Sequence, residues 1–145
     1  MVKEKPLPFT LDEKRARIGF SFNALTKSEQ KMVRILYDGG KNPAMTPYEI
    51  HSQIVRDEIK RLGVGGEIRE KFDAEEDGRK IHYSYEDFCR YLNEKYESGL
   101  PSYGAVRNIC MDFYIIGWLG ARKESFSKKY FLTKQTADVL KLTSF

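Results

Sequence analysis

The sequence has few of the features that mark secreted or membrane proteins. Its 145 residues include only two cysteines, Cys89 and Cys110, too few for the disulfide framework of a small secreted scaffold. The longest uncharged apolar run, residues 113–121, is far too short to cross a bilayer. The first twenty residues contain no apolar segment of the kind found in secretory signals. We therefore expect a cytoplasmic protein without membrane segments.

The motifs of common catalytic and cofactor sites are also missing. There is no GxxxxGK[ST] phosphate loop and no GxSxG nucleophile elbow. Acidic residues gather at 73–77, but without the spacing of an EF-hand, which favours a solvated loop. His51, His82, Cys89 and Cys110 lack the paired short spacings of zinc sites. We expect no catalytic residues, no cofactor and no metal, and no small-molecule ligand is evident.

Three of these residues are more simply explained as core residues. Cys89 and Cys110 fall on the apolar faces of two successive predicted helices, which favours buried thiols, with a disulfide as the alternative. His51 falls on the apolar side of another predicted helix, which favours a hydrogen-bonded core histidine.

The composition favours one folded domain. Apolar residues make up 41% of the chain, with nine Phe and nine Tyr, which is enough material for a core. Residues 1–24 show no clear periodicity and contain Pro6 and Pro8, so we expect an N-terminal arm that could include a short helix at 11–18. The domain itself should occupy residues 25–145.

Capping boxes predict where helices begin. In such a box a Ser or Thr side chain accepts from the amide three residues on, and an acid at that position accepts from the cap's own amide. Left-handed glycines predict where helices end. We expect helices from Thr26, with Glu29, to 38–40; from Thr46, with Pro47 and Glu49, to Leu62 before Gly63; and from Ser84, with Asp87, to Gly99.

The second of these helices has a broad apolar side on which more than one neighbour could pack. That side carries Ile50, Ile54, Val55, Ile59 and Leu62, and the polar side carries Ser52, Gln53, Arg56, Asp57 and Lys60. Residues 63–82 follow, rich in glycine and charge, and predict a long inserted loop or frayed helix.

The stretch 98–133 predicts a turn, a helix and a hairpin. Pro101 and Ser102 favour the start of a fourth helix, which should run to Ile116 before Gly117. Its core face carries Val106, Ile109, Cys110, Phe113 and Ile116, and its exposed side carries Gly104, Arg107, Asn108 and Met111, with Ser102 and Tyr103 leading. Extended segments at 118–123 and 129–133 should flank a polar tip at 124–128, before a last helix capped by Thr133.

Positive charge is concentrated in this hairpin. The net charge of the chain is +4, and residues 119–134 carry five basic residues against Glu124 alone, an excess equal to that of the whole chain. Residues 63–82 carry six acidic and four basic residues and form the acidic counterweight. A local basic excess of this kind favours a polyanionic partner.

The order of helix, turn, helix and basic hairpin predicts a mainly α (α+β) fold, a winged helix-turn-helix built on the helices at 84–96 and 102–116. Such a domain would bind double-stranded DNA, with the helix at 102–116 in the major groove and the wing at 119–133 on phosphates. Arg107 and Asn108 could read guanine and adenine, and Tyr103 could add specificity. Ser102 and the amides at the helix start could hold a phosphate. Further phosphate contacts would come from Arg122, Lys123, Lys128 and Lys129.

The sequence also resembles a known family. The run from Thr46 to Ile50, a later helix ending in Ile116-Gly117-Trp118-Leu119 and the basic hairpin after it are similar to archaeal winged-helix domains, most of all the C-terminal one of archaeal origin-recognition initiator proteins. The resemblance covers residues 25–133 and does not extend to an ATPase motor. It implies a DNA-binding domain in transcription regulation or DNA replication, with its recognition helix beginning at Ser102.

Other functions fit the same residues. A winged helix can serve as a protein-interaction adaptor without binding DNA, with the helix at 102–116 and the tyrosines contacting protein. An RNA or single-strand binder would instead stack bases on exposed aromatic rings such as those of Tyr103 or Phe126. A homodimer is also compatible with the sequence, joined through the N-terminal arm or the last helix.

Overall fold

The computed structural model of the chain describes residues 22–73, 75–76, 79–80 and 83–142. The protein is mainly helical with small antiparallel sheets, which confirms the expected α+β class. The expected helix at 11–18, and nearly all of the N-terminal arm, lie outside the described residues. In chain order the elements are α2 (Lys27–Tyr37), the 3-10 turn η1 (Asp38–Gly40), α3 (Pro47–Leu62), α4 (Gly65–Phe72), β1 (Glu75–Glu76), β2 (Arg79–Lys80), α5 (Tyr85–Tyr96), α6 (Tyr103–Ile115), β3 (Leu119–Glu124), β4 (Ser127–Leu132) and α7 (Lys134–Lys141).

The predicted helix starts are confirmed. At α3 the Glu49 amide donates to the Thr46 hydroxyl at 3.1 Å, and the Thr46 amide donates to the Glu49 carboxylate at 2.9 Å. The same reciprocal bonds cap α2 and α5. Ser102 and Thr133 cap α6 and α7 through their hydroxyls.

The predicted ends of α2 and α3 are confirmed, and the predicted end of α5 at Gly99 is wrong by two residues. α3 ends at Gly63, with φ +69°, and α2 ends at left-handed Asp38, within the predicted stretch 38–40, whereas α5 ends at left-handed Glu97. Residues other than glycine also adopt this left-handed conformation, at some energetic cost, so glycine is not required at a helix end. Gly99, with φ +65°, lies in the turn toward α6 and not at the end of α5.

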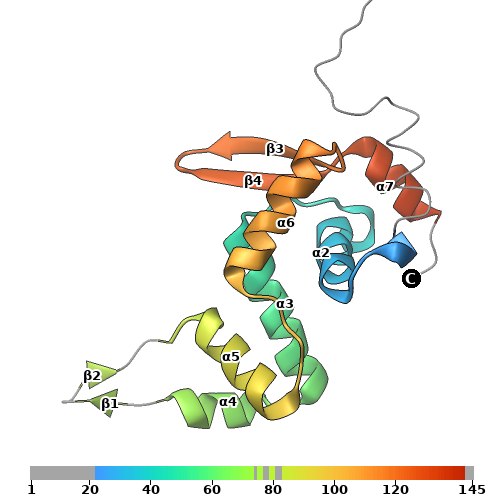
Figure 1. Cartoon of the computed structure of the whole chain (residues 1–145). Helices are drawn as coiled ribbons and strands as arrows, with labels where there is room; N and C mark the ends of the chain where they lie inside the picture. The colour runs from blue at the N-terminus through green and yellow to red at the C-terminus, as the bar shows by residue number, and fades with distance from the viewer. Residues whose placement is uncertain (1–21, 74, 77–78, 81–82, 143–145) are drawn as a thin grey trace, which may run out of the picture.

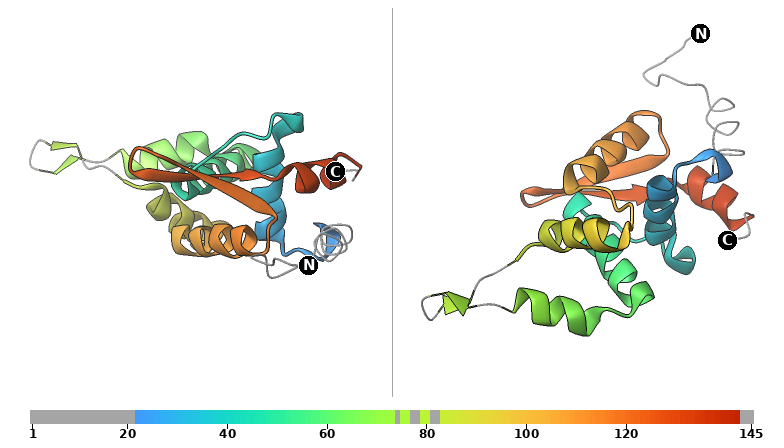
Figure 2. Two further views of the ribbon diagram at one scale, coloured as in Figure 1. Left: turned by 90° about the horizontal axis from the view of Figure 1, so that it is seen from above. Right: turned by 60° about the horizontal axis from the view of Figure 1, so that its bottom comes forward.

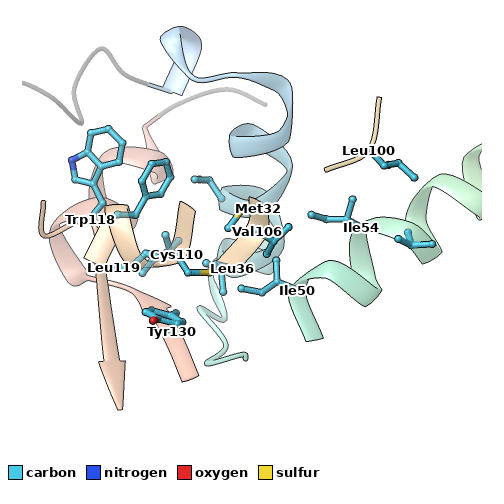
Figure 3. Packing of buried hydrophobic residues seen from close by; sticks show 14 of the residues in the cluster. Met32, Leu36, Ile50, Ile54, Leu100, Val106, Cys110, Trp118, Leu119 and Tyr130 are labelled. Carbon is cyan, nitrogen blue, oxygen red and sulfur yellow. The ribbon is translucent and has the colours of Figure 1, made fainter. Parts of the chain in front are cut away.

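α3 is the central helix of the fold. Helices α2, α5 and α6 all pack against it, and its apolar residues join those of α2, α6 and the β3–β4 hairpin in one core (Figure 3). Ser52 was predicted on the polar side but is buried, and its hydroxyl donates to the Tyr48 carbonyl at 2.8 Å. Glu58 is also buried, where the Arg61 guanidinium donates twice to its carboxylate. α3 is therefore covered on more sides than its sequence pattern indicated.

Of the two alternatives predicted for residues 63–82, a long loop or a frayed helix, the first half adopts the helix. Residues 65–72 form helix α4, and the two short strands that follow pair as a hairpin. The ring of Phe72 packs edge-to-face against those of Tyr83, Phe88 and Tyr91, with centroids 4.8, 4.9 and 5.6 Å away. This aromatic cluster holds α4 on α5 and could not be read from the glycines and charges of the segment.

α6 lies along α3, not along α5. The predicted pairing of the helices at 84–96 and 102–116 is thus corrected: α4, the β1–β2 hairpin and α5 form a unit at one end of α3, and α6 returns to the other end (Figure 1). Both hairpins project from the same side of the molecule (Figures 1 and 2).

The β3–β4 hairpin is longer than predicted and its tip is shorter. The register pairs Glu124 with Ser127, so the tip is the two residues Ser125 and Phe126, not 124–128. Met45 adds a bridge to the hairpin, because its amide and carbonyl bond those of Tyr130 at 2.9 and 2.8 Å. The hairpin is thereby anchored directly before α3.

Both cysteines are free and buried, as predicted from their positions on apolar helix faces. Burial raises the pKa of the Cys89 thiol to about 11 and that of Cys110 to about 12. His51 is 1% exposed and its Nε2 donates to the Pro101 carbonyl at 3.1 Å, so it is the expected hydrogen-bonded core histidine.

Candidate nucleic-acid interface

An open groove of about 620 Å³ separates the exposed side of α6 from the hairpin. One wall is α6, the other is β4 with the hairpin tip, and the N-terminus of α3 closes one end. We call it the α6–β4 groove. Its lining residues are Thr46, Pro47, Tyr48, Glu49, Tyr103, Arg107, Met111, Phe126, Ser127, Lys128, Lys129 and Tyr130.

The α6 wall presents residues spaced by one helical turn. Tyr103, Arg107 and Met111 lie four residues apart, so they share one face of the helix. The Arg107 guanidinium lies 6.0 Å from the centroid of the Tyr103 ring, and the Tyr48 ring packs edge-to-face on Tyr103 at 6.4 Å. The wall therefore offers a cation supported by aromatic rings, with all five guanidinium donors on an exposed side chain.

The hairpin wall places like charges opposite one another. Arg122 pairs across the strands with Lys129, and Lys123 with Lys128. Like charges directly opposite in an antiparallel pair are destabilising, because their side chains lie only about 5 Å apart. Such a pair raises the energy of the hairpin unless a neighbouring group offsets the repulsion.

The two pairs differ in compensation. Glu124 forms ion pairs with Arg122 and, at 3.4 Å, with Lys129, and these two cations hold the pKa of its carboxyl below the ordinary value. Lys123 and Lys128 lie on the opposite face of the hairpin from Arg122 and Lys129. The same face carries the core residue Tyr130, farther from the tip. The Lys128 ammonium lies over the Tyr114 ring at 5.3 Å and lines the groove. The uncompensated pair therefore faces α6.

The start of α6 is held by a carboxylate. The Tyr103 amide donates to Glu86 of α5 at 3.0 Å, and Ser102 accepts from the Ala105 amide at 3.1 Å. The same Glu86 oxygen lies 3.8 Å from His51 Nε2. A phosphate at the position predicted from the sequence would have to displace this carboxylate.

The structure brings some of the predicted site residues together and leaves others apart. Tyr103, Arg107, Lys128 and Lys129 line the same groove. Asn108 is exposed on α6 beside Arg107 but outside the groove lining, and Arg122 and Lys123 are exposed on β3. Ser102 borders a separate hollow with Tyr48, His51, Ser84, Glu86, Tyr103 and Gly104.

Sequence reasoning missed several residues of the groove. The α3 start at Thr46–Glu49 was interpreted only as a helix cap, and Glu86 was not considered as a partner of α6. Phe126 entered only as a stacking candidate for single strands. The sequence could have indicated Phe126 as a binding residue, because an apolar residue at the tip of a polar hairpin gains nothing from folding.

The described ranges contain neither a metal-binding cluster nor a membrane-spanning helix. No group of three or more His, Cys, Asp or Glu side chains is placed to hold a metal ion. No helix in the described part of the chain is both long and apolar enough to cross a membrane. Comparison of the chain with protein-family models, with curated proteins and with solved structures found no match.

Proposed function

We propose that the chain binds double-stranded DNA through the α6–β4 groove, as a transcription regulator or a replication-associated factor. α6 would enter the major groove, and the β3–β4 hairpin would lie against the phosphates of the flanking backbone. The function is binding without catalysis.

The observation that carries the proposal is the like-charged cross-strand contact between Lys123 and Lys128. Unlike Arg122 and Lys129, which share ion pairs with Glu124, these two lysines oppose hairpin formation without a compensating carboxylate among the described residues, so folding does not explain their arrangement. A polyanion removes the repulsion by placing negative charge between the cations, and release of condensed counterions adds to the affinity. Regularly spaced phosphates would supply this negative charge beside Lys123 and Lys128, which have no carboxylate partner among the described residues.

The arrangement of helices supports a winged helix-turn-helix with an insertion. α3 and α6 are the two packed helices, and the β3–β4 hairpin directly after α6 is the wing. Residues 63–101 are then an insertion between the two helices, with α4, β1–β2 and α5 as its elements. This reassignment keeps the recognition helix and wing of the sequence prediction and changes only the first helix of the motif.

The groove chemistry divides the contacts into two kinds. Arg107 can donate two parallel hydrogen bonds to the O6 and N7 of guanine. Asn108, the next residue along α6, can hydrogen-bond adenine through its side-chain amide. Lys128 and Lys129 can contact phosphates without regard to sequence. Arg107 and Asn108 would specify the site, and the hairpin would supply most of the affinity.

The test is duplex binding as a function of salt. We expect fluorescence anisotropy with a labelled duplex of about 25 base pairs to show binding at ~50 mM salt that falls at least tenfold by ~200 mM, because phosphate contacts release counterions. Selection of bound fragments from random duplex DNA then supplies the preferred sequence. Absence of binding at ~50 mM, an affinity insensitive to salt, or preference for single strands in direct competition would contradict the proposal.

One observation favours a second candidate, a protein-interaction adaptor. Met111, Tyr114 and Ile115 of α6 are 48%, 46% and 58% exposed, which is apolar area typical of a protein contact. An adaptor of this kind would show no duplex affinity at low salt.

A further inference from the structure

The tip of the β3–β4 hairpin presents an aromatic ring with no folding role. Phe126 is 101% exposed, and it makes no ring contact with any residue that the structure describes. A single exposed apolar residue is common on protein surfaces. What distinguishes Phe126 is its position at the end of a two-residue tip, next to the uncompensated pair of Lys123 and Lys128.

The hairpin holds this ring well away from the core. The buried residue nearest the tip on the groove-facing side is Tyr130, and the hairpin continues for four more residues to Phe126. At about 3.3 Å per residue, the tip reaches about 13 Å beyond Tyr130. Figure 1 shows the hairpin extending past α6. That reach is enough to cross the sugar–phosphate backbone beside a helix that lies in the major groove, whose width is about 12 Å.

The tip is narrow and its backbone conformation is defined. Ser125 has φ +55°, which turns the chain within two residues and leaves Phe126 as the outermost side chain. The minor groove of B-DNA is only about 6 Å wide, so a two-residue turn and its ring match it better than the whole hairpin does. The lysines beside the tip would then face the phosphates along both edges of that groove.

We propose that Phe126 is a base-stacking wedge for duplex DNA. With α6 in the major groove, the hairpin tip enters the neighbouring minor groove and the Phe126 ring inserts at a base step, unstacking it and bending the duplex. Apolar side chains inserted in this way kink DNA, and flexible pyrimidine–purine steps yield most easily. The inference rests on the proposed duplex binding and adds a preferred substrate, a duplex with a TA or CA step under the hairpin tip.

The experiment places 2-aminopurine at a TA step beside the selected binding site. The wild-type chain is expected to raise the fluorescence of this base on binding, because an unstacked 2-aminopurine is no longer quenched. Phe126→Ala should bind with less than about tenfold loss, keep the salt dependence of the wild type and leave the fluorescence at the level of the free duplex. Leu142→Ala, a change of another exposed apolar residue at the C-terminal end of α7, should behave as the wild type.

A second variant tests the wedge through fluorescence of the protein instead of the DNA. The only tryptophan of the chain, Trp118, is buried, so Phe126→Trp places a single exposed indole at the tip. Its emission should be quenched by stacking when duplex is added. A fluorescence rise that survives in Phe126→Ala, or no quenching in Phe126→Trp despite binding, would overturn the wedge.

Two further outcomes distinguish failure of duplex binding from a different role for Phe126. Wild-type chain that does not bind duplex at ~50 mM salt contradicts the proposed function itself, and not only the wedge. A change of molecular mass in solution between wild type and Phe126→Ala assigns the ring to contact between copies of this chain and overturns the wedge.

Discussion

Arg107 and Lys128 stand on opposite walls of the α6–β4 groove, each over an aromatic ring. Arg107 lies over Tyr103 and Lys128 over Tyr114. The ring orients each cation without neutralising it, so the charge stays available to a ligand. The two side chains nevertheless differ in what they can do, because a guanidinium has a planar fork of donors and an ammonium is a point charge.

Arg107→Ala should lower affinity for the selected DNA site by about 1 to 3 kcal/mol and relax its sequence preference, because two directed bonds to a guanine are lost. Lys128→Ala should weaken all duplexes alike. Competition between the selected site and random DNA measures both effects. Equal loss by Arg107→Ala on the two kinds of DNA would remove Arg107 from the base readers, and Arg69→Ala, an exposed change on α4, is the control.

Single residues were predictable where local chemistry decides their place. The exposure of Arg107 and the burial of Val106, Cys110 and Phe113 follow from helical spacing alone. The burial of Ser52 and Glu58 does not, because it depends on which helices surround α3. Phe126 was placed within a five-residue tip, and only the strand register shows that it is one of two tip residues.

At the scale of elements, α5 contacts the start of α6 through a carboxylate. Glu86 of α5 accepts from the first amide of α6, where the helix dipole attracts negative charge. This carboxylate therefore occupies the end of α6 that would otherwise attract a phosphate. It also places a negative charge beside Tyr103, which lines the α6–β4 groove.

Glu86→Gln should raise duplex affinity about fivefold. The amide oxygen of Gln can still accept from the Tyr103 amide, so the start of the helix is kept. The negative charge that repels phosphate is removed, and in water its repulsion is worth about 1 kcal/mol at about 4 Å. Titration of labelled duplex at ~50 mM salt measures the change. Glu94→Gln, an exposed change farther along α5, should leave affinity unaltered; equal effects of both variants would show only a change in net charge.

Elements with their own capping signals were predicted well. α2, α3, α5, α6 and α7 begin at the capping residues that the sequence indicated, because those bonds are local. α4 has no side-chain cap, and its stability comes from the Phe72 cluster and from contacts with α5. The contact between α3 and α6 joins segments about 50 residues apart, and local pattern carries no information about it.

At the scale of the whole molecule, α4 and α5 are fastened together at one end of α3. Glu67 of α4 accepts from the hydroxyls of Tyr91 and Tyr96, each at 2.5 Å, and from the Lys95 ammonium at 2.6 Å. Lys95, followed by the two tyrosines, lowers the pKa of the Glu67 carboxyl to about 2. The carboxylate thus locks α4 onto α5, whose other end positions Glu86.

Glu67→Gln should lower the unfolding temperature at neutral pH, because the charge-assisted bonds to α5 are lost. A carboxyl whose pKa falls from an ordinary 4.5 to about 2 on folding stabilises above pH 4.5, and this contribution disappears as pH falls toward 2. The difference in unfolding temperature from wild type should therefore shrink between pH 5 and pH 2. Thermal melts followed by circular dichroism test this, with exposed Glu70→Gln on the same helix as control. A difference constant across this pH range would contradict the lock.

The central claim is that the uncompensated lysines of the hairpin, Lys123 and Lys128, contact phosphates, and the slope of log affinity against log salt tests it most directly. The double variant Lys123→Gln/Lys128→Gln should reduce the magnitude of that slope by about 2, since each phosphate contact contributes about 0.9. Lys27→Gln/Lys60→Gln, which removes two exposed lysines on α2 and α3 outside the α6–β4 groove, should leave the slope unchanged. Identical slopes for the two double variants would contradict the account.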